Sequence, residues 1–253
     1  DLTIDPGVEI QFADGKGIDM AGACNKLVMK GNDTAEGRIL ATNLGDGTTG
    51  LGFAFTNGGC SSANEDDRHE FEYVTFNNLS TAISAGSRHG NSPHYNGNVG
   101  NFTMSDVSFT NVGTAISHGS GQGTGFDLSG VSISGASDDC ISLPDDSVLT
   151  WVGGGATNCN TMQHSGSGAI WTGTGSSVTL EDVDFESYAN GIIGNAADIW
   201  MSNVTINSAS STTQSGIGLG QTGTQTSGTS LDLYNVDASG FAHALKTHAT
   251  DDI

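Results

Sequence analysis

Basic, imidazole and phenol side chains gather in two short stretches of this sequence. They come from the acidic run 64–70 and from the Gly-rich stretch 86–100: Arg68, His69, Arg88, His89, His94 and Tyr95. The chain has only seven Lys and Arg in 253 residues, so this grouping is the best candidate for a site. Guanidinium groups bind carboxylates, and His or Tyr can act as a general base.

Two functional interpretations of this group remain open, beside a structural one. An enzyme would use Arg68, Arg88, His89, His94 and Tyr95, with His or Tyr95 as the base. A carbohydrate-binding protein would use His69, Arg88, His94 and Tyr95. In the structural interpretation the arginines pair with neighbouring acids and the histidines are solvated, as is usual for charge clusters in loops.

Carboxylates recur at a second place, where Asp182, Asp184 and Glu186 follow one another at alternate positions. Several carboxylate oxygens around one corner are the ligands that Ca²⁺ prefers, so calcium is the one cofactor considered. Hydrated acids on an outward face are the alternative.

Four cysteines occur, without a close Cys-x-x-Cys pair that would indicate zinc or redox chemistry. Of the three possible pairings, Cys24–Cys60 and Cys140–Cys159 is the simplest, and it favours an extracellular or cell-surface location. Four Asn-x-Ser/Thr sequons are compatible with that location, although a chain rich in Asn, Ser and Thr produces them by chance. The sequons begin at Asn32, Asn78, Asn101 and Asn203.

The net charge is −21, from 28 Asp and Glu against seven Lys and Arg. Nucleic-acid binding needs a basic stripe, and anionic membranes also attract basic segments, so both partners are excluded. No apolar run approaches 18 residues, so membrane insertion is not expected. The first residue is Asp1, and we expect the chain to be a fragment or the mature part of a longer one.

The elements that must position these groups are short strands in an internal repeat. In residues 102–117 (FTMSDVSFTNVGTAIS) apolar residues alternate, but the parity breaks at Ser105-Asp106, which indicates two strands joined by a polar corner. Each repeat is anchored on a valine, with apolar residues two positions later and three and five positions earlier. The anchors are Val74, Val107, Val131, Val183, Val204 and Val236. The 52 residues between Val131 and Val183 fit two coils, one of them degenerate, around Trp151-Val152 and Ala169-Ile170-Trp171.

Units that bury apolar faces only by stacking on one another form a solenoid. About nine to ten coils, spaced by the strand separation, predict a rod roughly 45 Å long. We expect one domain over 1–253, with irregular coils in 1–60 and regular repeats in 61–253.

The segments LSGVSISGASDDCISL and LEDVDFESYANGIIG resemble the right-handed, single-stranded parallel β-helix repeat of pectate lyases, polygalacturonases, phage tailspikes and microbial surface proteins. The opening LTIDPGVEIQF resembles the first coil of the surface-protein members. The resemblance covers nearly the whole chain and implies an all-β fold, but this scaffold hosts unrelated activities.

Within that resemblance, Ser137-Asp138-Asp139-Cys140 is similar to the Asp-Asp-Cys segment of polygalacturonases, where paired carboxylates act as acid and base. The family's other motifs do not follow here, and no Arg or Lys occurs between this segment and Lys246. A pectate-lyase-like reaction would need a basic residue beside its calcium site, and Lys246 is the one available there.

Trp151, Trp171 and Trp200 would offer a sugar platform if exposed, although buried tryptophan is more common in a thin core. No capping helix is visible at either end of the repeats, which leaves two interpretations: the chain is part of a longer solenoid, or its coil ends associate with those of neighbouring copies. We therefore expect an extracellular noncatalytic β-helix scaffold: a cell-surface, adhesin, sheath or fibre subunit. The alternative is a lyase or glycoside hydrolase acting on an acidic polysaccharide.

Overall fold

The strands form two sheets in which neighbouring strands run parallel. The computed structural model describes residues 2–20, 26–45, 48–55, 69–85, 102–118, 124–143, 145–163, 167–195, 198–209, 214–219 and 230–246. Within these ranges the regular structure is strand, with no helix. The predicted all-β class with parallel pairing is therefore confirmed.

The first sheet consists of two rows of strand segments, which we call its legs. In each passage the chain contributes one segment to each leg and then continues to the second sheet. The first leg is built by β1 (Leu2–Ile4), β4 (Leu27–Lys30), β7 (His69–Glu72), β10 (Phe102–Ser105) and β17 (Ser177–Glu181). The second leg is built by β2 (Glu9–Phe12), β5 (Ile39–Asn43), β8 (Val74–Asn77), β11 (Ser108–Thr110) and β18 (Asp184–Ser187). Four long strands run through both legs: β13 (Gly125–Ser134), β15 (Val148–Cys159), β20 (Asp198–Ser208) and β22 (Ser230–Ser239).

The second sheet takes one strand from each passage of the chain. Over the described residues it holds nine strands: β3 (Ile18–Asp19), β6 (Gly50–Phe55), β9 (Leu79–Ala85), β12 (Thr114–His118), β14 (Ile141–Leu143), β16 (Gly168–Thr172), β19 (Asn190–Gly194), β21 (Ser215–Leu219) and β23 (His243–Lys246). We number the passages as layers 1 to 9, from β1–β3 to β22–β23.

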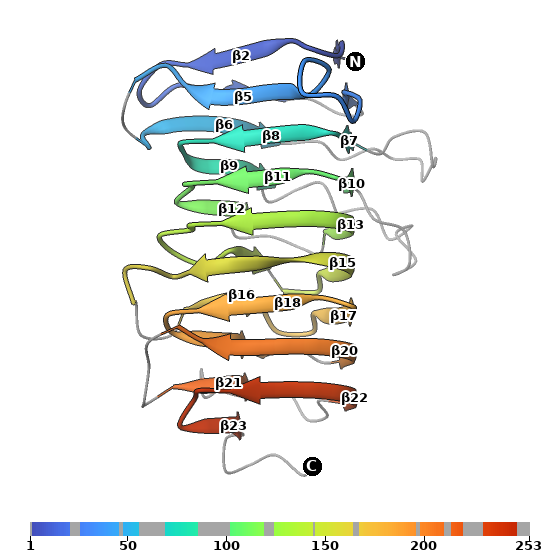
Figure 1. Ribbon diagram of the computed structural model, residues 1–253, viewed down its shortest axis with the longest axis vertical. Coiled ribbons are helices and arrows are strands. Elements are labelled where there is room, and N and C mark those ends of the chain that lie inside the picture. The colour runs from blue at the N-terminus through green and yellow to red at the C-terminus, as the bar shows by residue number, and fades with distance from the viewer. Residues whose placement is uncertain are drawn as a thin grey trace.

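Each layer lies against the next along the long axis of the molecule (Figure 1). In layers 3 and 4, for example, β7 pairs with β10, β8 with β11 and β9 with β12. The chain therefore advances by one strand spacing, about 4.8 Å, per passage.

A left-handed residue separates the two legs of the first sheet and produces the parity break seen in the sequence. Asp106, between β10 and β11, has a φ of 53°. The equivalent residues of layers 3 and 5 to 9 also have positive φ: Tyr73, Gly130, Gly153, Asp182, Asn203 and Asn235. Gly, Asn and Asp adopt this conformation at least cost, so the corner composition follows from backbone sterics, with Tyr73 as the exception.

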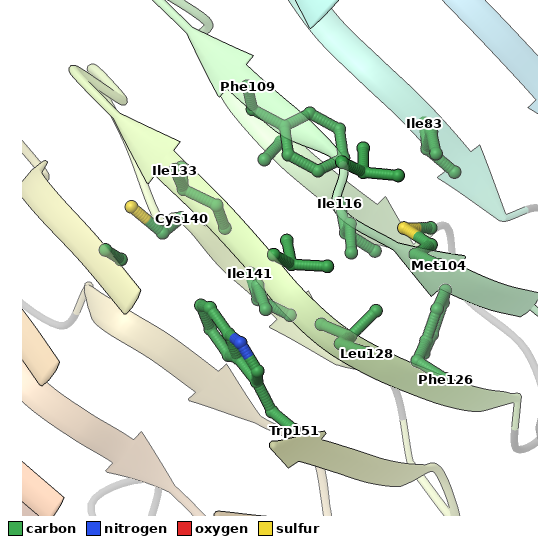
Figure 2. Packing of buried hydrophobic residues seen from close by; sticks show 14 of the residues in the cluster. Ile83, Met104, Phe109, Ile116, Phe126, Leu128, Ile133, Cys140, Ile141 and Trp151 are labelled. Carbon is green, nitrogen blue, oxygen red and sulfur yellow. The ribbon is translucent and has the colours of Figure 1, made fainter. Parts of the chain in front are cut away.

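Like residues lie over like in the core between the two sheets. Phe76, Phe109 and Ile133 are register partners on the second leg, and the rings of Phe76 and Phe109 stack with centroids 5.0 Å apart. Figure 2 shows Phe109 and Ile133 beside Ile116 and Ile141 of the second sheet. All five side chains are at most 1% exposed, so the predicted inward row is buried.

Three layers, 1, 2 and 6, belong to the repeat although none of the six valine anchors lies in them. Ile39 pairs with Val74, and Gly154 pairs with Val131, so these residues hold the anchor position in layers 2 and 6. The 52-residue interval is thus two layer steps, as expected. However, Trp151 and Ile170 belong to the two sheets of one layer rather than to two successive coils. Layer 1 pairs with layer 2 in the same parallel manner, through β1 with β4, β2 with β5 and β3 with β6.

Candidate functional site

The two long connections that carry the predicted site leave and re-enter the sheets at neighbouring positions. Phe55 and Ala85, the last residues of β6 and β9, are register partners. His69 and Phe102, the first residues of β7 and β10, are also partners. The strand residues that flank the two connections are therefore paired in adjacent layers. Five predicted residues of this group lie outside the described residues: Arg68, Arg88, His89, His94 and Tyr95.

His69 is a core residue, which corrects its assignment to an exposed carbohydrate site. Its side chain is 2% exposed, and its ring lies 4.3 Å from that of Phe55 and 4.8 Å from that of Phe102. Its Nδ1 atom accepts a hydrogen bond from the Leu27 backbone N–H at 3.1 Å. The physical reason is parity: His69 stands five residues before Val74, which is an inward position in the other repeats.

A cation–anion–cation group on the first sheet was missed in the sequence. Glu70 accepts hydrogen bonds from Lys26, at 2.6 Å, and from Lys30. These bonds, that from Lys26 above all, hold the pKa of Glu70 below its ordinary value, while the bond to Glu70 raises the pKa of Lys30. The pairing of β4 with β7 would have been needed to find this group, because Glu70 stands 40 or more residues after either lysine.

The Asp-Asp-Cys segment has a structural use. Asp139 Oδ1 accepts a hydrogen bond of 2.7 Å from the backbone N–H of Gly168, in the next layer. Cys140 forms the expected disulfide with Cys159. An acid–base pair needs a carboxylate that faces substrate, whereas Asp139 faces the protein's own backbone. The other expected bond, Cys24–Cys60, lies outside the described residues.

The carboxylates expected to bind calcium do not converge. Asp182 lies at a left-handed corner and its Oδ1 accepts a hydrogen bond from Asn203 Nδ2 at 3.0 Å, whereas Asp184 and Glu186 lie on β18. Within the described ranges, no group of three His, Cys, Asp or Glu side chains is placed to hold a metal ion. The predicted site at Asp182, Asp184 and Glu186 is therefore not formed by these side chains.

The sequons occupy different environments. The Asn203 side chain donates a hydrogen bond to Asp182 and accepts one from Asn235. It therefore joins the corner residues of three successive layers. Asn32 is exposed, and its Oδ1 accepts hydrogen bonds from the N–H and the hydroxyl of Thr34. Asn78 is half-buried with a φ of 56°, and Asn101 lies outside the described residues.

A hollow of about 340 Å³ lies over β3, β6 and β9 of the second sheet. Leu51, Ala54, Thr81 and Ser84 contribute to its lining, and Asp19 is its one ionisable residue among those described. One carboxylate among apolar and hydroxyl groups does not provide an acid–base pair.

No protein-family model, curated protein or solved structure matches the chain. The site must therefore be interpreted from its own chemistry.

The three tryptophans differ in exposure, and Trp200 is the most exposed of them. Trp151 is fully buried, and its indole N–H donates to the Gly153 carbonyl at 2.9 Å. Trp171 is half-buried on the second sheet, and Trp200 on β20 is 40% exposed. In the part of the chain that the structure describes, no helix has the length and apolar character needed to cross a membrane.

Four of the described carboxylates join neighbouring layers. Glu70 joins layer 3 to layer 2, Asp139 joins layer 5 to layer 6, and Asp182 joins layer 7 to layer 8. Asp14 likewise accepts from Thr49 at 2.6 Å, and this bond lowers the pKa of Asp14. These groups cross-link the stack instead of facing a substrate.

Proposed function

We propose that the chain is a right-handed, single-stranded parallel β-helix that serves as an extracellular noncatalytic scaffold. Its support is an inward row at one register position of the second sheet, unbroken from layer 1 to layer 9. The row consists of Ile18, Phe53, Ile83, Ile116, Ile141, Ile170, Ile192, Ile217 and Leu245. Right-handedness is favoured because crossover connections between parallel strands of one sheet are right-handed in nearly all proteins.

The scaffold role is supported by how the ionisable side chains are used. Among the described residues, several carboxylates, such as Asp139 and Asp182, form hydrogen bonds that join neighbouring layers, and no group of three His, Cys, Asp or Glu side chains is placed to hold a metal ion. An extracellular location is supported by the Cys140–Cys159 disulfide, because such bonds persist in oxidising compartments. The strong acidity supports the same role, since self-repulsion keeps an exposed rod soluble.

Self-association of coil ends is part of this proposal. In layer 9, Leu233 occupies the inward position of Met201 but is 44% exposed, and β22 pairs only with β20 among the described strands. An unpaired strand edge beside apolar side chains is a template for another copy. We expect the chain to form concentration-dependent oligomers in light scattering at moderate salt.

Leu233→Lys should abolish this association. Leu51→Lys is the matched control, because Leu51 is 46% exposed but lies on the second sheet in layer 2. A parent chain that stays monomeric, or a Leu233→Lys variant that still associates, would remove end-to-end assembly from the proposal.

The noncatalytic role is tested by incubating the full chain with a panel of acidic and neutral polysaccharides. We expect neither new reducing ends nor unsaturated products. Products that form with the parent chain and disappear in Arg88→Ala would establish the alternative, a lyase or hydrolase of an acidic polysaccharide. Loss in Arg88→Ala would matter only if its unfolding midpoint equals that of the parent.

A further inference from the structure

Trp200 is the centre of a grid of nine outward side chains on the first sheet. Its strand β20 lies between β17 and β22 (Figure 1). Trp200 pairs with Thr179 on one side and Asp232 on the other, and Ser202 pairs with Glu181 and Tyr234. Asp198 pairs with Ser177 and Ser230, which completes the grid. Because side chains alternate along a strand, these nine positions share the outer face.

The exposed aromatic surface belongs to two members of this grid. Trp200 is 40% exposed and Tyr234 is 70% exposed. They lie on adjacent strands, two residues out of register, which brings large side chains within reach of each other. Together they form an aromatic surface on a flat sheet face.

Packing does not account for a tryptophan at this position. The next residue, Met201, is fully buried, whereas the indole of Trp200 makes no hydrogen bond or ring contact with the described residues. Four other layers place small polar residues at its register position: Thr103, Asp127, Thr150 and Thr179. Trp151, by contrast, contributes to the core through an edge-to-face contact with Phe185.

The groups around Trp200 determine the chemistry of a ligand. An indole face binds the apolar C–H face of a pyranose ring, while hydroxyls and carboxylates around it pair with sugar hydroxyls. The grid supplies such groups from Thr179, Ser202 and Asp232. It contains three carboxylates, from Glu181, Asp198 and Asp232, and no Lys or Arg, so it repels uronic-acid and sulfated chains.

We propose that this nine-residue surface binds an uncharged polysaccharide, with Trp200 as the stacking platform. The inference goes beyond the scaffold role and does not depend on it, since it requires only the register of β17, β20 and β22. It also does not involve the connections at 56–68 and 86–101.

Binding is tested with the full chain by affinity electrophoresis and by intrinsic tryptophan fluorescence. The probes are neutral β-glucan, xylan, mannan and dextran, with polygalacturonate as the anionic comparison. We expect at least one neutral polysaccharide to retard the protein and to change its fluorescence, and polygalacturonate to do neither.

The decisive variant is Trp200→Thr, which matches the threonines at the same register position and so suits the strand. It should weaken binding by up to about tenfold, the loss expected when one aromatic stacking contact is removed. Trp200→Phe should retain weaker binding, and Tyr234→Ala should weaken it a few-fold. Trp171→Phe is the control and should bind as the parent does.

Three outcomes would overturn the proposal. These are no retardation by any neutral polysaccharide, equal binding by Trp200→Thr, or preferential binding of polygalacturonate. A negative result here leaves the scaffold proposal intact, because that proposal is tested separately, by light scattering and by the assay for polysaccharide products.

Discussion

Arg38 of layer 2 forms a hydrogen bond with Asp106 of layer 4, across the intervening layer 3. Its Nη1 atom donates a hydrogen bond to the backbone carbonyl of Asp106 at 3.1 Å, although Arg38 precedes β5 in layer 2 and Asp106 lies in layer 4. The guanidinium carbon lies 5.6 Å from the centroid of the Tyr73 ring, which belongs to the intervening layer. One side chain thus contacts three successive layers at the corner of the first sheet.

Replacing Arg38 should loosen this corner. Arg38→Ala removes a hydrogen bond and a cation–π contact, so we expect a loss of about 1–2 kcal/mol in the free energy of unfolding. Arg38→Lys should recover less than half of this, because an ammonium lacks the planar fork that stacks on tyrosine. Urea unfolding measures both, and Lys16→Ala is the control. An Arg38→Ala variant as stable as the parent would show that the contact adds nothing.

Glu70 should make stability depend on pH on the acid side. Its folded pKa lies below the ordinary 4.5 because of its bonds to Lys26 and Lys30. Its contribution is therefore fully present above pH 4.5 and is lost as the pH falls through the depressed pKa. Glu70→Gln should cost about 1 kcal/mol at pH 7, a modest value because the pair is partly solvated.

The parent and Glu70→Gln should converge as the pH falls from 7 to 3, measured by urea unfolding at each pH. Asp184→Asn, an exposed carboxylate on the same sheet, should show a smaller change. A Glu70→Gln deficit that persists undiminished at pH 3 would contradict this account.

His69 should resist replacement by a more apolar ring. His69→Phe keeps the contacts with Phe55 and Phe102 but removes the Nδ1 acceptor of the buried Leu27 N–H. An unsatisfied buried donor costs about 1–3 kcal/mol. Thermal and urea unfolding should show that loss, while Leu149→Met in the same inward row should cost less. If His69→Phe matches or exceeds the parent, the hydrogen bond is not a source of stability.

The disulfide should stabilise the middle of the stack. Cys140 stands before β14 in layer 5 and Cys159 ends β15 in layer 6, and the two are 19 residues apart. A cross-link of that span contributes roughly 3 kcal/mol by restricting the unfolded chain.

The double variant Cys140→Ala/Cys159→Ala, unfolded under oxidising conditions, isolates this contribution. A reductant would also act on any bond formed by Cys24 and Cys60, so the variant is the cleaner comparison. A loss below about 1 kcal/mol in the free energy of unfolding would mean that the disulfide reduces the conformational entropy of the unfolded chain only slightly.

Much of the fold could be predicted because the information is local. The parity break at Ser105-Asp106 marks the left-handed corner, and the spacing from Val107 to Phe109 and Ile116 marks which side chains enter the core. His69 also stands at an inward position of this spacing, five residues before Val74. It was nevertheless assigned to a surface site, because histidine is a common binding residue. Its position in the repeat predicted its burial correctly, whereas its residue type did not.

The candidate site depended on contacts between distant residues. Glu70 and Lys26 meet because β4 and β7 pair, and Arg38 meets Asp106 because layers 2 to 4 stack. The extent of exposure is also a tertiary property: Trp151 and Trp200 are both strand residues, yet one is buried and the other open.

The sequence alone therefore determined the short strands, their corners and the apolar rows, since each follows from steric and solvation preferences repeated along the chain. Only the tertiary structure decided which polar side chains join layers and which face solvent. That choice is made by neighbours tens of residues away, whose positions emerge when the layers stack.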